Sequence, residues 1–319
     1  MKKGICVIGA GYWGKNHIKT LHQLDSLKGV VEINDIALSS LSKNYPGIRL
    51  HKSIVEALRE DYDGYIIATP AKTHYEIAKK VIYSQKPILI EKPLTLSIEE
   101  AEDLVDLANQ KQVNAMVGHV LLFHPAIIEI KKIIEKGDIG QLQYIYSNRL
   151  NLGKVRTEEN VFWSLAPHDI AIFQYLTGSL PKEINAKGNA FLQKGIPDST
   201  LTQLEYENGV NGHIFVSWLH PFKEHRLVVI GSEAMISFED SLDENQLKYY
   251  SKKFDLKSGI PEKIDGPVKI IPFENKMPLE IELEYFLHHL KEEKPTISDI
   301  QNGLQVVKIL VEASKQILK

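Results

Sequence analysis

The chain has 319 residues, which exceeds the usual length of one open α/β domain, so we expect two domains. Hydrophobic residues make up 43% and charged residues 25% of the sequence, a composition typical of globular rather than disordered proteins. The 38 basic and 41 acidic residues are interleaved without a basic tail, which argues against a nucleic acid partner.

No apolar run reaches the ~18 residues of a membrane-spanning helix, and the early glycines leave no room for a signal-peptide core. Cys6 is the single cysteine, so no internal disulfide can form, and we expect this side chain in the core. These features predict a cytoplasmic protein without a membrane partner.

The first part of the chain alternates between short apolar runs and amphipathic segments, which is the pattern of a doubly wound parallel sheet. The alternation predicts an α/β Rossmann domain over residues 1–122. Ser97 and Glu100 have the spacing of a capping box at the start of its last helix. We expect strands at 4–8, 29–33, 64–68, 87–90 and 113–117, and helices at 17–24, 37–43, 73–84 and 97–108.

Residues 123–319 show a different pattern. After an expected helix at 125–136, runs of alternating polarity predict antiparallel strands at 143–150, 200–206 and 210–218. Asn208-Gly209 between the last two runs is typical of a type I′ hairpin turn. We predict an α+β domain for substrate binding and oligomerisation, with a large, open and mostly antiparallel sheet. A helix is expected at 170–176, and a last helix at 304–318 is a candidate for packing back on the first domain.

A glycine-rich loop follows the first predicted strand and opens the first predicted helix. Its glycine spacing allows a tight turn, a close approach of the backbone to a pyrophosphate and a helix N-terminus that faces the phosphates. We predict a dinucleotide site here, with a plain glycine turn as the alternative. The loop consists of Gly9, Ala10, Gly11, Tyr12, Trp13 and Gly14.

Three further segments at strand ends are candidates for contacts with the dinucleotide. Glu32 ends the second strand, where a carboxylate binds the adenosine ribose hydroxyls and repels a 2′-phosphate, which favours NAD over NADP. Asp35 is the alternative for this role. Thr69 and Pro70 follow the third strand, and His74 is either a further cofactor contact or a helix-start residue with its own polar partner.

The residues Glu91, Lys92 and Pro93 end a continuous apolar strand of the predicted Rossmann sheet. We expect Glu91 and Lys92 to contact the cofactor. A lysine beside a buried cofactor can also orient a hydroxyl group and take part in proton transfer. The alternative is a solvated loop charge.

Four segments together resemble the Gfo/Idh/MocA family of oxidoreductases: the Gly9–Gly14 loop, Ala68-Thr69-Pro70 with His74, Glu91-Lys92-Pro93 and Pro167-His168-Asp169. The resemblance implies that Lys92 and His168 are catalytic and face the carbon that gives up hydride. His168 precedes the expected helix 170–176, whose dipole favours the neutral imidazole of a general base. A structural histidine is the alternative.

The chain departs from the family pattern at one position. Many members carry an aspartate four residues before the histidine, where this chain has Ser164. Ser164 can hydrogen-bond a substrate or cap a helix, but it cannot carry the charge of a carboxylate. Asp169 is expected either to orient His168 or to lie in the first turn of the helix.

Residues 147–156 and 160–164 resemble the branch of this family that oxidises the 3-hydroxyl group of UDP-N-acetylglucosamine or its uronic acid. The resemblance implies NAD as cofactor and a 3-keto sugar as product, for amino-sugar synthesis in a cell-surface polysaccharide or lipid A. Arg149, Lys154 and Arg156 lie close in sequence, and guanidinium groups suit a diphosphate; a solvated loop is the alternative. The predicted substrate-binding residues are Lys92, Arg149, Asn151, Arg156, Ser164 and His168.

Other functions are compatible with the same motifs. Keto-sugar reduction is disfavoured by Glu32, since NADP is the usual reductant, whereas oxidation of another sugar or polyol remains an alternative. NAD-dependent glycoside hydrolysis is disfavoured by the short chain and the missing export signal. A cofactor-sensing regulator is disfavoured by the presence of both Lys92 and His168.

The remaining histidines show no spacing typical of metal ligands, so we expect no metal site. His119 and His124 lie near the domain junction and are expected either to touch the substrate or to pack in the core. His288 and His289 are expected on a helix surface. An open antiparallel sheet needs a cover for its exposed face, which predicts a homo-oligomer, a dimer or tetramer, through the second domain.

Overall fold

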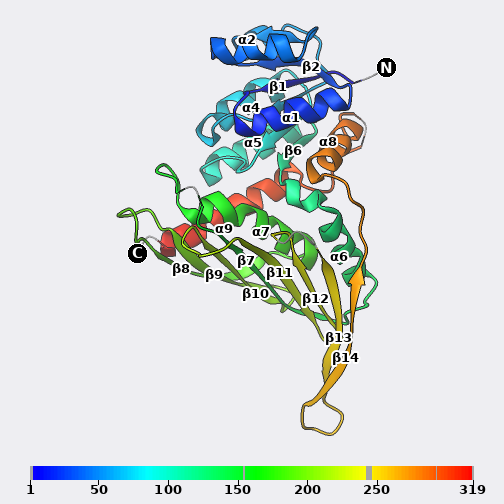
Figure 1. Ribbon diagram of the computed structural model, residues 1–319. Helices are drawn as coiled ribbons and strands as arrows, with labels where there is room; N and C mark the ends of the chain where they lie inside the picture. Colours follow the sequence, from blue (N-terminus) through cyan, green and yellow to red (C-terminus); the bar gives the residue numbers. More distant parts are fainter. Residues whose placement is uncertain (1–2, 154, 242–245, 292, 318–319) are drawn as a thin grey trace. The chain divides into compact units, whose positions relative to one another are not determined.

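Figure 1 shows the computed structural model of the chain, which describes residues 3–153, 155–241, 246–291 and 293–317. The chain forms two compact units. The first comprises Met1–Phe123 and Met277–Lys308, and the second comprises His124–Lys276 and Ile309–Lys319. The first unit is therefore built from two separate stretches of sequence. The expected division at residue 122 lies beside the observed one, but the return of the whole stretch from Met277 was not expected.

The first unit contains a six-stranded sheet in which every neighbouring pair is parallel. The spatial order is β3-β2-β1-β4-β5-β6. All residues of β1, β4, β5 and β6 are buried, as expected for a sheet covered on both faces. The strands are β1 (Ile5–Ile8), β2 (Leu27–Val31), β3 (Arg49–His51), β4 (Gly64–Ile67), β5 (Ile88–Glu91) and β6 (Ala115–Gly118).

The order of these strands determines where the helices lie. The chain runs from β1 to β2 in one direction along the sheet and from β4 to β5 in the other, so right-handed crossovers place α1 and α4 on opposite faces. This reversal is the position at which doubly wound sheets bind ligands, beyond the carboxyl ends of the strands. The helices are α1 (Tyr12–Gln23), α2 (Asp35–Asn44), α3 (Ile54–Ala57), α4 (His74–Tyr83), α5 (Ile98–Lys111), α8 (Pro278–His288) and the start of α9 (Ile300–Ile317), with 3-10 turns η1 (Ala71–Thr73) and η2 (Val120–Phe123).

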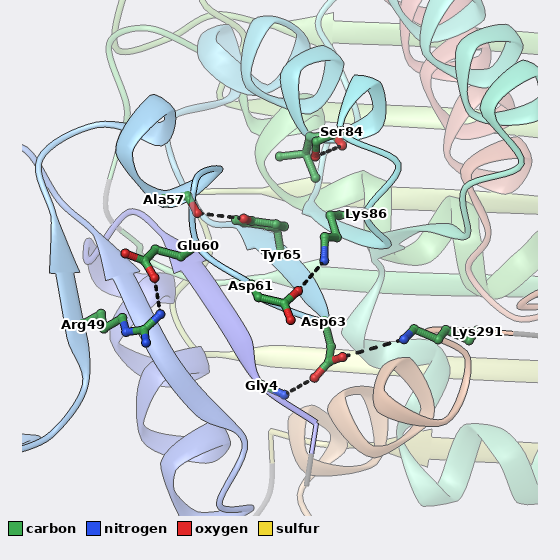
Figure 2. Close-up of polar contacts among 11 residues, drawn as sticks. Gly4, Arg49, Ala57, Glu60, Asp61, Asp63, Tyr65, Ser84, Lys86 and Lys291 are labelled. Atoms are coloured by element: carbon green, nitrogen blue, oxygen red, sulfur yellow. Dashed lines mark hydrogen bonds and ion pairs between the residues drawn. The ribbon is translucent and has the colours of Figure 1, made fainter. Parts of the chain in front are cut away.

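The amino-terminal edge of this sheet is tied together by Asp63, which precedes β4 (Figure 2). Its carboxylate accepts a hydrogen bond from the backbone N–H of Gly4 (2.7 Å) and lies 3.9 Å from the Lys291 ammonium group. Lys86, which precedes β5, forms an ion pair with Asp61 at 3.1 Å. A cavity of about 480 Å³ is lined by Asp63, Lys86 and Lys291, among others. Asp63 thus connects the first strand to the returning stretch after α8.

The second unit contains an eight-stranded sheet with the order β14-β13-β12-β11-β7-β10-β9-β8. Only β7 and β10 pair in parallel, so the prediction of a mostly antiparallel sheet is confirmed for the described residues. The strands are β7 (Leu142–Leu150), β8 (Pro181–Asn189), β9 (Ser199–Tyr206), β10 (Asn211–Ser217), β11 (Glu224–Gly231), β12 (Met235–Glu239), β13 (Leu247–Asp255) and β14 (Glu262–Ile271).

Helices cover one face of this second sheet. Helix α7 (Val161–Thr177) packs on β7, β9 and β10, and α6 (Pro125–Glu135) packs on α7 (Figure 1). The end of α9 is fixed to β8 by Gln316, whose side chain accepts from the Ala186 N–H (2.9 Å) and donates to the Ile184 carbonyl (2.8 Å). In the described part of this unit, no helix lies on the other face of the sheet.

The hairpin between β9 and β10 differs from the expected type I′ turn. Tyr206 and Val210 are joined by a backbone hydrogen bond (2.8 Å), and the Gly209 N–H donates to the Tyr206 carbonyl (3.0 Å). Gly209 has φ of +84°, whereas Asn208 has no positive φ. The connection is therefore a three-residue loop in which only the glycine takes the left-handed conformation.

Candidate cofactor and catalytic site

The glycine loop lies between β1 and α1, as the sequence predicts. Gly9 has φ of +95°, and a Cβ on Gly14 would lie 2.1 Å from the Gly9 carbonyl oxygen, so both positions require glycine. A Cβ on Gly11 would meet no atom within 4 Å, which means that the loop faces open space. Gly11 caps α1 without a side-chain acceptor, so the first N–H groups of the helix are available for an anion. This geometry fits a pyrophosphate.

The carboxylate of Glu32 lies against this loop, directly after β2. It accepts hydrogen bonds from the backbone N–H groups of Ala10 (2.8 Å) and Asn34 (2.9 Å). The rival residue Asp35 instead begins α2 and forms an exposed ion pair with Lys52 at 2.6 Å. Glu32 is therefore the carboxylate that is fixed beside the loop, where the ribose of a dinucleotide is expected.

Tyr12 and Trp13 start α1, and their rings form an edge-to-face pair with centroids 6.4 Å apart. Tyr12 is 84% exposed, although it is a large aromatic residue next to the glycine loop. A tyrosine in this position offers an aromatic surface to a bound nucleotide. Both residues thus lie at the predicted cofactor site.

His74 is buried at the start of α4 and connects the ends of two strands. Its Nε2 lies 2.9 Å from the carbonyl oxygen of Thr69 after β4, and its Nδ1 lies 2.9 Å from the carbonyl oxygen of Pro93 after β5. The Thr69 hydroxyl in turn lies 2.7 Å from that of Thr73. Of the two interpretations offered by the sequence, the structure shows the helix-start residue with its own polar partners. His74 holds the two loops that carry Thr69, Pro70 and Lys92.

The turn Glu91-Lys92-Pro93 begins at the last residue of β5 and contains a cis peptide bond before Pro93. The Glu91 carboxylate lies 2.7 Å from Nε2 of the fully buried His17 on α1 and accepts the backbone N–H of Lys92 (3.2 Å). Lys92 itself is half-buried. Its side chain is thus presented by a turn that is fixed on one side by Glu91 and on the other by His74.

His119 follows β6 and is almost completely buried. Burial, and then the positive charge of Lys92, lower the pKa of His119 to about 3, so the ring is neutral. The burial agrees with the alternative in which His119 packs in the core. His119 is nevertheless a neighbour of Lys92 within the first unit.

The second group of candidate residues lies on α7 in the second unit. The helix begins at Val161 after the N-cap Asn160, whose side chain accepts the Trp163 N–H (3.1 Å), and it continues through Pro167. The expected start at residue 170 is therefore wrong by nine residues, since 170 − 161 = 9. His168 is half-buried in the middle of the helix, so the argument from the positive end of the dipole does not apply to it.

Ser164 is a buried residue in the first turns of α7, and the backbone N–H of Ser164 donates to the Asn160 carbonyl. Asn160, and not Ser164, is the cap of the helix. Ser164 and His168 are four residues apart on one helix, so their side chains share a face. This arrangement agrees with a joint role in substrate binding.

The sequence predicts an open guanidinium group at Arg149, but the structure shows this group already paired. It lies on β7 and forms a bidentate ion pair with Asp169 of α7, with Nε to Oδ2 at 2.9 Å and Nη2 to Oδ1 at 3.0 Å. Both side chains are buried, with exposed fractions of 11% and 3%. The expectation fails because the acceptor comes from a distant helix, and Asp169 orients Arg149 rather than His168. The third nitrogen of the Arg149 guanidinium group, Nη1, lies 3.5 Å from His225 Nδ1.

The other predicted substrate-binding residues lie on the loop between β7 and α7. Asn151 is half-buried, and its side-chain oxygen is buried without a hydrogen-bond partner in the described part of the chain. Arg156 is exposed and pairs with Glu159 at 3.0 Å. Lys154 lies outside the described residues. The loop therefore carries one accessible guanidinium group and one buried amide oxygen.

Lys92 belongs to the first unit, and His168 belongs to the second. The prediction that both face one substrate carbon thus concerns both units and stays a prediction. The described residues contain no group of three histidine, cysteine, aspartate or glutamate side chains that could hold a metal ion. None of the helices traced in the structure has the length and apolar character required to cross a bilayer.

Two buried polar side chains of the first unit, His17 and Glu282, are not singled out by the sequence. His17 is buried on the same face of α1 as Ile18 and Leu21, so its spacing is that of an ordinary core residue. Glu282 is fully buried on α8, the late helix that the sequence predicts at His288 and His289 without giving its start. Helical spacing among Leu279, Glu282, Leu283 and Phe286 is the signal that could have indicated a buried acid.

Comparison with known protein families gives two matches that together span most of the chain. Residues 3–119 match the model described as an oxidoreductase family with an NAD-binding Rossmann fold. Residues 127–237 match the model of the GFO/IDH/MocA C-terminal domain. The two matches coincide with the parallel sheet of the first unit and with much of the sheet of the second.

Similar proteins include two named dehydrogenases. UDP-N-acetylglucosamine 3-dehydrogenase from Acidithiobacillus ferrooxidans is 27% identical over 324 residues, which is 97% of this chain and 97% of that protein. The scyllo-inositol 2-dehydrogenase (NAD(+)) from Bacillus subtilis is 31% identical over 54% of each chain.

Solved structures show the same fold. A structure of the Acidithiobacillus ferrooxidans enzyme matches with a TM-score of 0.87 at 24% identity, covering 100% of this chain and 98% of that one. GenD2 from gentamicin A biosynthesis, in complex with NAD, matches with a TM-score of 0.81 at 20% identity, covering 99% and 94%.

Proposed function

The chain belongs to the Gfo/Idh/MocA family of NAD-binding oxidoreductases, and from this premise we propose that it oxidises the 3-hydroxyl group of a UDP-N-acetylhexosamine. The substrate is UDP-N-acetylglucosamine or its uronic acid, and the product is a 3-keto sugar. The observation that carries this proposal is the similarity to the Acidithiobacillus ferrooxidans enzyme, which extends over 97% of both chains.

The cofactor side of the proposal is supported by the glycine loop and by Glu32. The loop and the first turn of α1 would hold the pyrophosphate, and Glu32 would bind the adenosine ribose hydroxyls. Bound NAD supplies the acceptor for the hydride. The turn at Lys92 lies at the carboxyl ends of the same parallel strands, which is the edge used for ligands in such sheets.

The proposed roles of this chain's own residues concern the hydroxyl proton. Lys92 would orient the sugar hydroxyl, and His168 would accept its proton as general base. Ser164, on the same face of α7 as His168, would donate to the sugar in place of the aspartate found in many relatives. Arg156 and Asn151 remain the candidates for the diphosphate and sugar contacts, because Arg149 is paired with Asp169.

The direct test is an assay of purified protein with NAD and each candidate sugar nucleotide. We expect an increase in the absorbance of reduced cofactor with UDP-N-acetylglucosamine or its uronic acid, and no comparable signal with NADP. The proposal of the substrate fails if neither sugar nucleotide is turned over or bound.

A second candidate is a polyol dehydrogenase, which the similarity to scyllo-inositol 2-dehydrogenase favours. That similarity extends over only 54% of the chain, so we place it behind the sugar nucleotide. The same assay with scyllo-inositol and myo-inositol separates the two, since a polyol dehydrogenase does not need a diphosphate.

We further propose that the chain forms a homo-oligomer through the open face of its second sheet. Along β10 the buried residues Gly212, Ile214 and Val216 alternate with half-buried His213 and Phe215, which must point to the opposite face. There the ring of His213 stacks on that of Tyr146, with centroids 5.0 Å apart. A second copy of this chain would cover these apolar and aromatic side chains.

A further inference from the structure

His17 is a histidine in the interior of the first unit, on the helix that follows the glycine loop. Its exposed fraction is 0%, and it lies on the face of α1 that carries the buried residues Gly14, Ile18 and Leu21. A buried imidazole needs a hydrogen-bond partner, whereas an apolar side chain would fill the same space without one. The reason for a histidine at this position is therefore expected in the group that its ring contacts.

That group is the carboxylate of Glu91, the last residue of β5. His17 Nε2 lies 2.7 Å from Glu91 Oε1, and the glutamate itself is 8% exposed. Because a carboxylate accepts hydrogen bonds, Nε2 is the ring nitrogen that donates. Nδ1 of His17 has no hydrogen-bond partner in the described part of the chain. Glu91 is therefore the polar group that orients the ring, through a short hydrogen bond to a charged acceptor.

The other oxygen of the same carboxylate holds the backbone of the turn. Glu91 Oε2 accepts the N–H of Lys92 at 3.2 Å. This oxygen lies against Gly118 of β6, where a Cβ atom would be only 3.1 Å away, so the carboxylate occupies the space that the glycine leaves. One carboxylate thus connects α1 through His17 to the backbone of Lys92.

The helix that carries His17 is also the one that begins at the predicted dinucleotide site. Trp13, one turn earlier on α1, is a predicted cofactor contact, and its ring lies 6.4 Å from the ring of His17 between centroids. The first N–H groups of this helix follow Gly11, where the pyrophosphate is expected. The same helix therefore serves the cofactor at its first turn and the Lys92 turn one turn later.

We propose that His17 is a positioning residue for Lys92: through Glu91 it fixes the turn of Lys92 on the helix of the glycine loop, so that the lysine and the cofactor keep one geometry. The proposal rests on the proposed function only in assigning Lys92 to the reaction. A displacement of about 1 Å at a reacting group can lower a rate on the order of 10²-fold. We therefore expect His17 to affect the rate and not the affinity for NAD.

The position of the turn can be measured without any substrate. In protein made with ¹⁵N-labelled lysine, the backbone amide resonance that disappears in Lys92→Arg belongs to Lys92. We expect this amide to exchange its hydrogen about 10-fold faster in His17→Leu than in the parent, because its acceptor Glu91 has lost its own partner. The amide of Lys79, in the middle of α4, is the internal reference and should keep its rate. Equal exchange of the Lys92 amide in both proteins would overturn the proposal.

Two amide variants separate positioning from a general need for a polar residue, and they replace His17→Leu if that protein does not fold. His17→Gln brings an N–H group near the place of Nε2, whereas His17→Asn ends one carbon earlier, near the place of Nδ1. We expect His17→Gln to restore slow exchange of the Lys92 amide and His17→Asn to leave it fast. The proposal is wrong if the two amides give the same exchange rate.

The kinetic consequence is measured with the substrate that the assay identifies. His17→Leu is expected to lower kcat by about 10–100-fold while the Kd for NAD changes little. His22→Leu, the same substitution at an exposed position of the same helix, is the control and should change neither. A parallel loss of NAD affinity would assign His17 to the cofactor site instead. The exchange rates need no sugar nucleotide, so a failure of the proposed substrate and a failure of this inference give different results.

Discussion

Lys92 is the residue on which the proposed reaction depends most directly. Lys92→Ala is expected to lower kcat by about 10²–10⁴-fold, because a positioned acid–base group contributes this much, while the Kd for NAD changes little. The measurement combines initial rates with calorimetric titration of NAD. Lys80→Ala, an exposed position on α4, is the control. Full activity of Lys92→Ala would instead remove Lys92 from the catalytic residues.

Glu32 is the single side chain proposed to set the cofactor preference. Glu32→Ser is expected to raise the KM for NAD by about 10-fold or more, since a hydrogen bond to a charged group contributes ~1.5–3 kcal/mol. The same change should narrow the preference for NAD over NADP, because the carboxylate no longer repels a 2′-phosphate. Asp35→Ser serves as the control, as Asp35 pairs with Lys52 on the surface. If Asp35→Ser raises the KM for NAD more than Glu32→Ser does, the ribose contact belongs to Asp35 and not to Glu32.

At the scale of elements, the ion pair between Arg149 and Asp169 joins β7 to α7. Arg149→Met leaves the Asp169 carboxylate buried without its partner and is expected to lower the free energy of unfolding by about 3–5 kcal/mol. Arg149→Met combined with Asp169→Leu should recover most of this loss, since no buried charge remains. Urea titrations measure both effects.

The matched control for this pair is Arg156→Met. Arg156 forms an exposed pair with Glu159, whose removal should change the free energy of unfolding by no more than ~1 kcal/mol. If Arg149→Met lowers the free energy of unfolding no more than Arg156→Met does, the buried pair does not stabilise the packing of α7 on β7. If Arg149→Met loses sugar-nucleotide binding while its free energy of unfolding is unchanged, Arg149 belongs to the substrate site.

Elements and sites differ in how far the sequence determines them. The parallel strands and the glycine loop were predictable because each depends on a contiguous pattern of apolar residues and glycines. The three-residue β3 and the four-residue α3 are too short to show such a pattern. The pairs Arg149–Asp169 and His17–Glu91 join positions 20 and 74 residues apart, so only the folded chain reveals that these charges are engaged.

At the scale of the whole molecule, the open face of the second sheet predicts self-association. Phe215→Glu places a charge on this face and is expected to reduce the mass in solution to that of a monomer, measured by light scattering after size exclusion. Lys80→Glu in the first unit is the control and should leave the mass unchanged. A parent protein that is already a monomer at micromolar concentration would contradict the proposed oligomer.

The discontinuity of the first unit has a consequence for the order of synthesis. The stretch Met277–Lys308 supplies side chains and carbonyl groups to the first sheet: Ser298 donates to the Val117 carbonyl of β6 (2.6 Å), and Asn114 donates to the His289 carbonyl (2.8 Å). These partners leave the ribosome only after all of His124–Lys276 has been made, which takes on the order of ten seconds or more at ~5–20 residues per second.

During that interval the nascent Rossmann sheet lacks α8 and the contacts of β6, so the second unit can fold before the first is finished. We expect a fragment that ends at Phe123 to bind no NAD, and we expect NAD binding to return when a peptide spanning 277–308 is added. Calorimetric titration measures both. A fragment that binds NAD by itself would show that the late segment is dispensable for the cofactor. The cofactor pocket would then depend on residues that are translated long after its glycine loop.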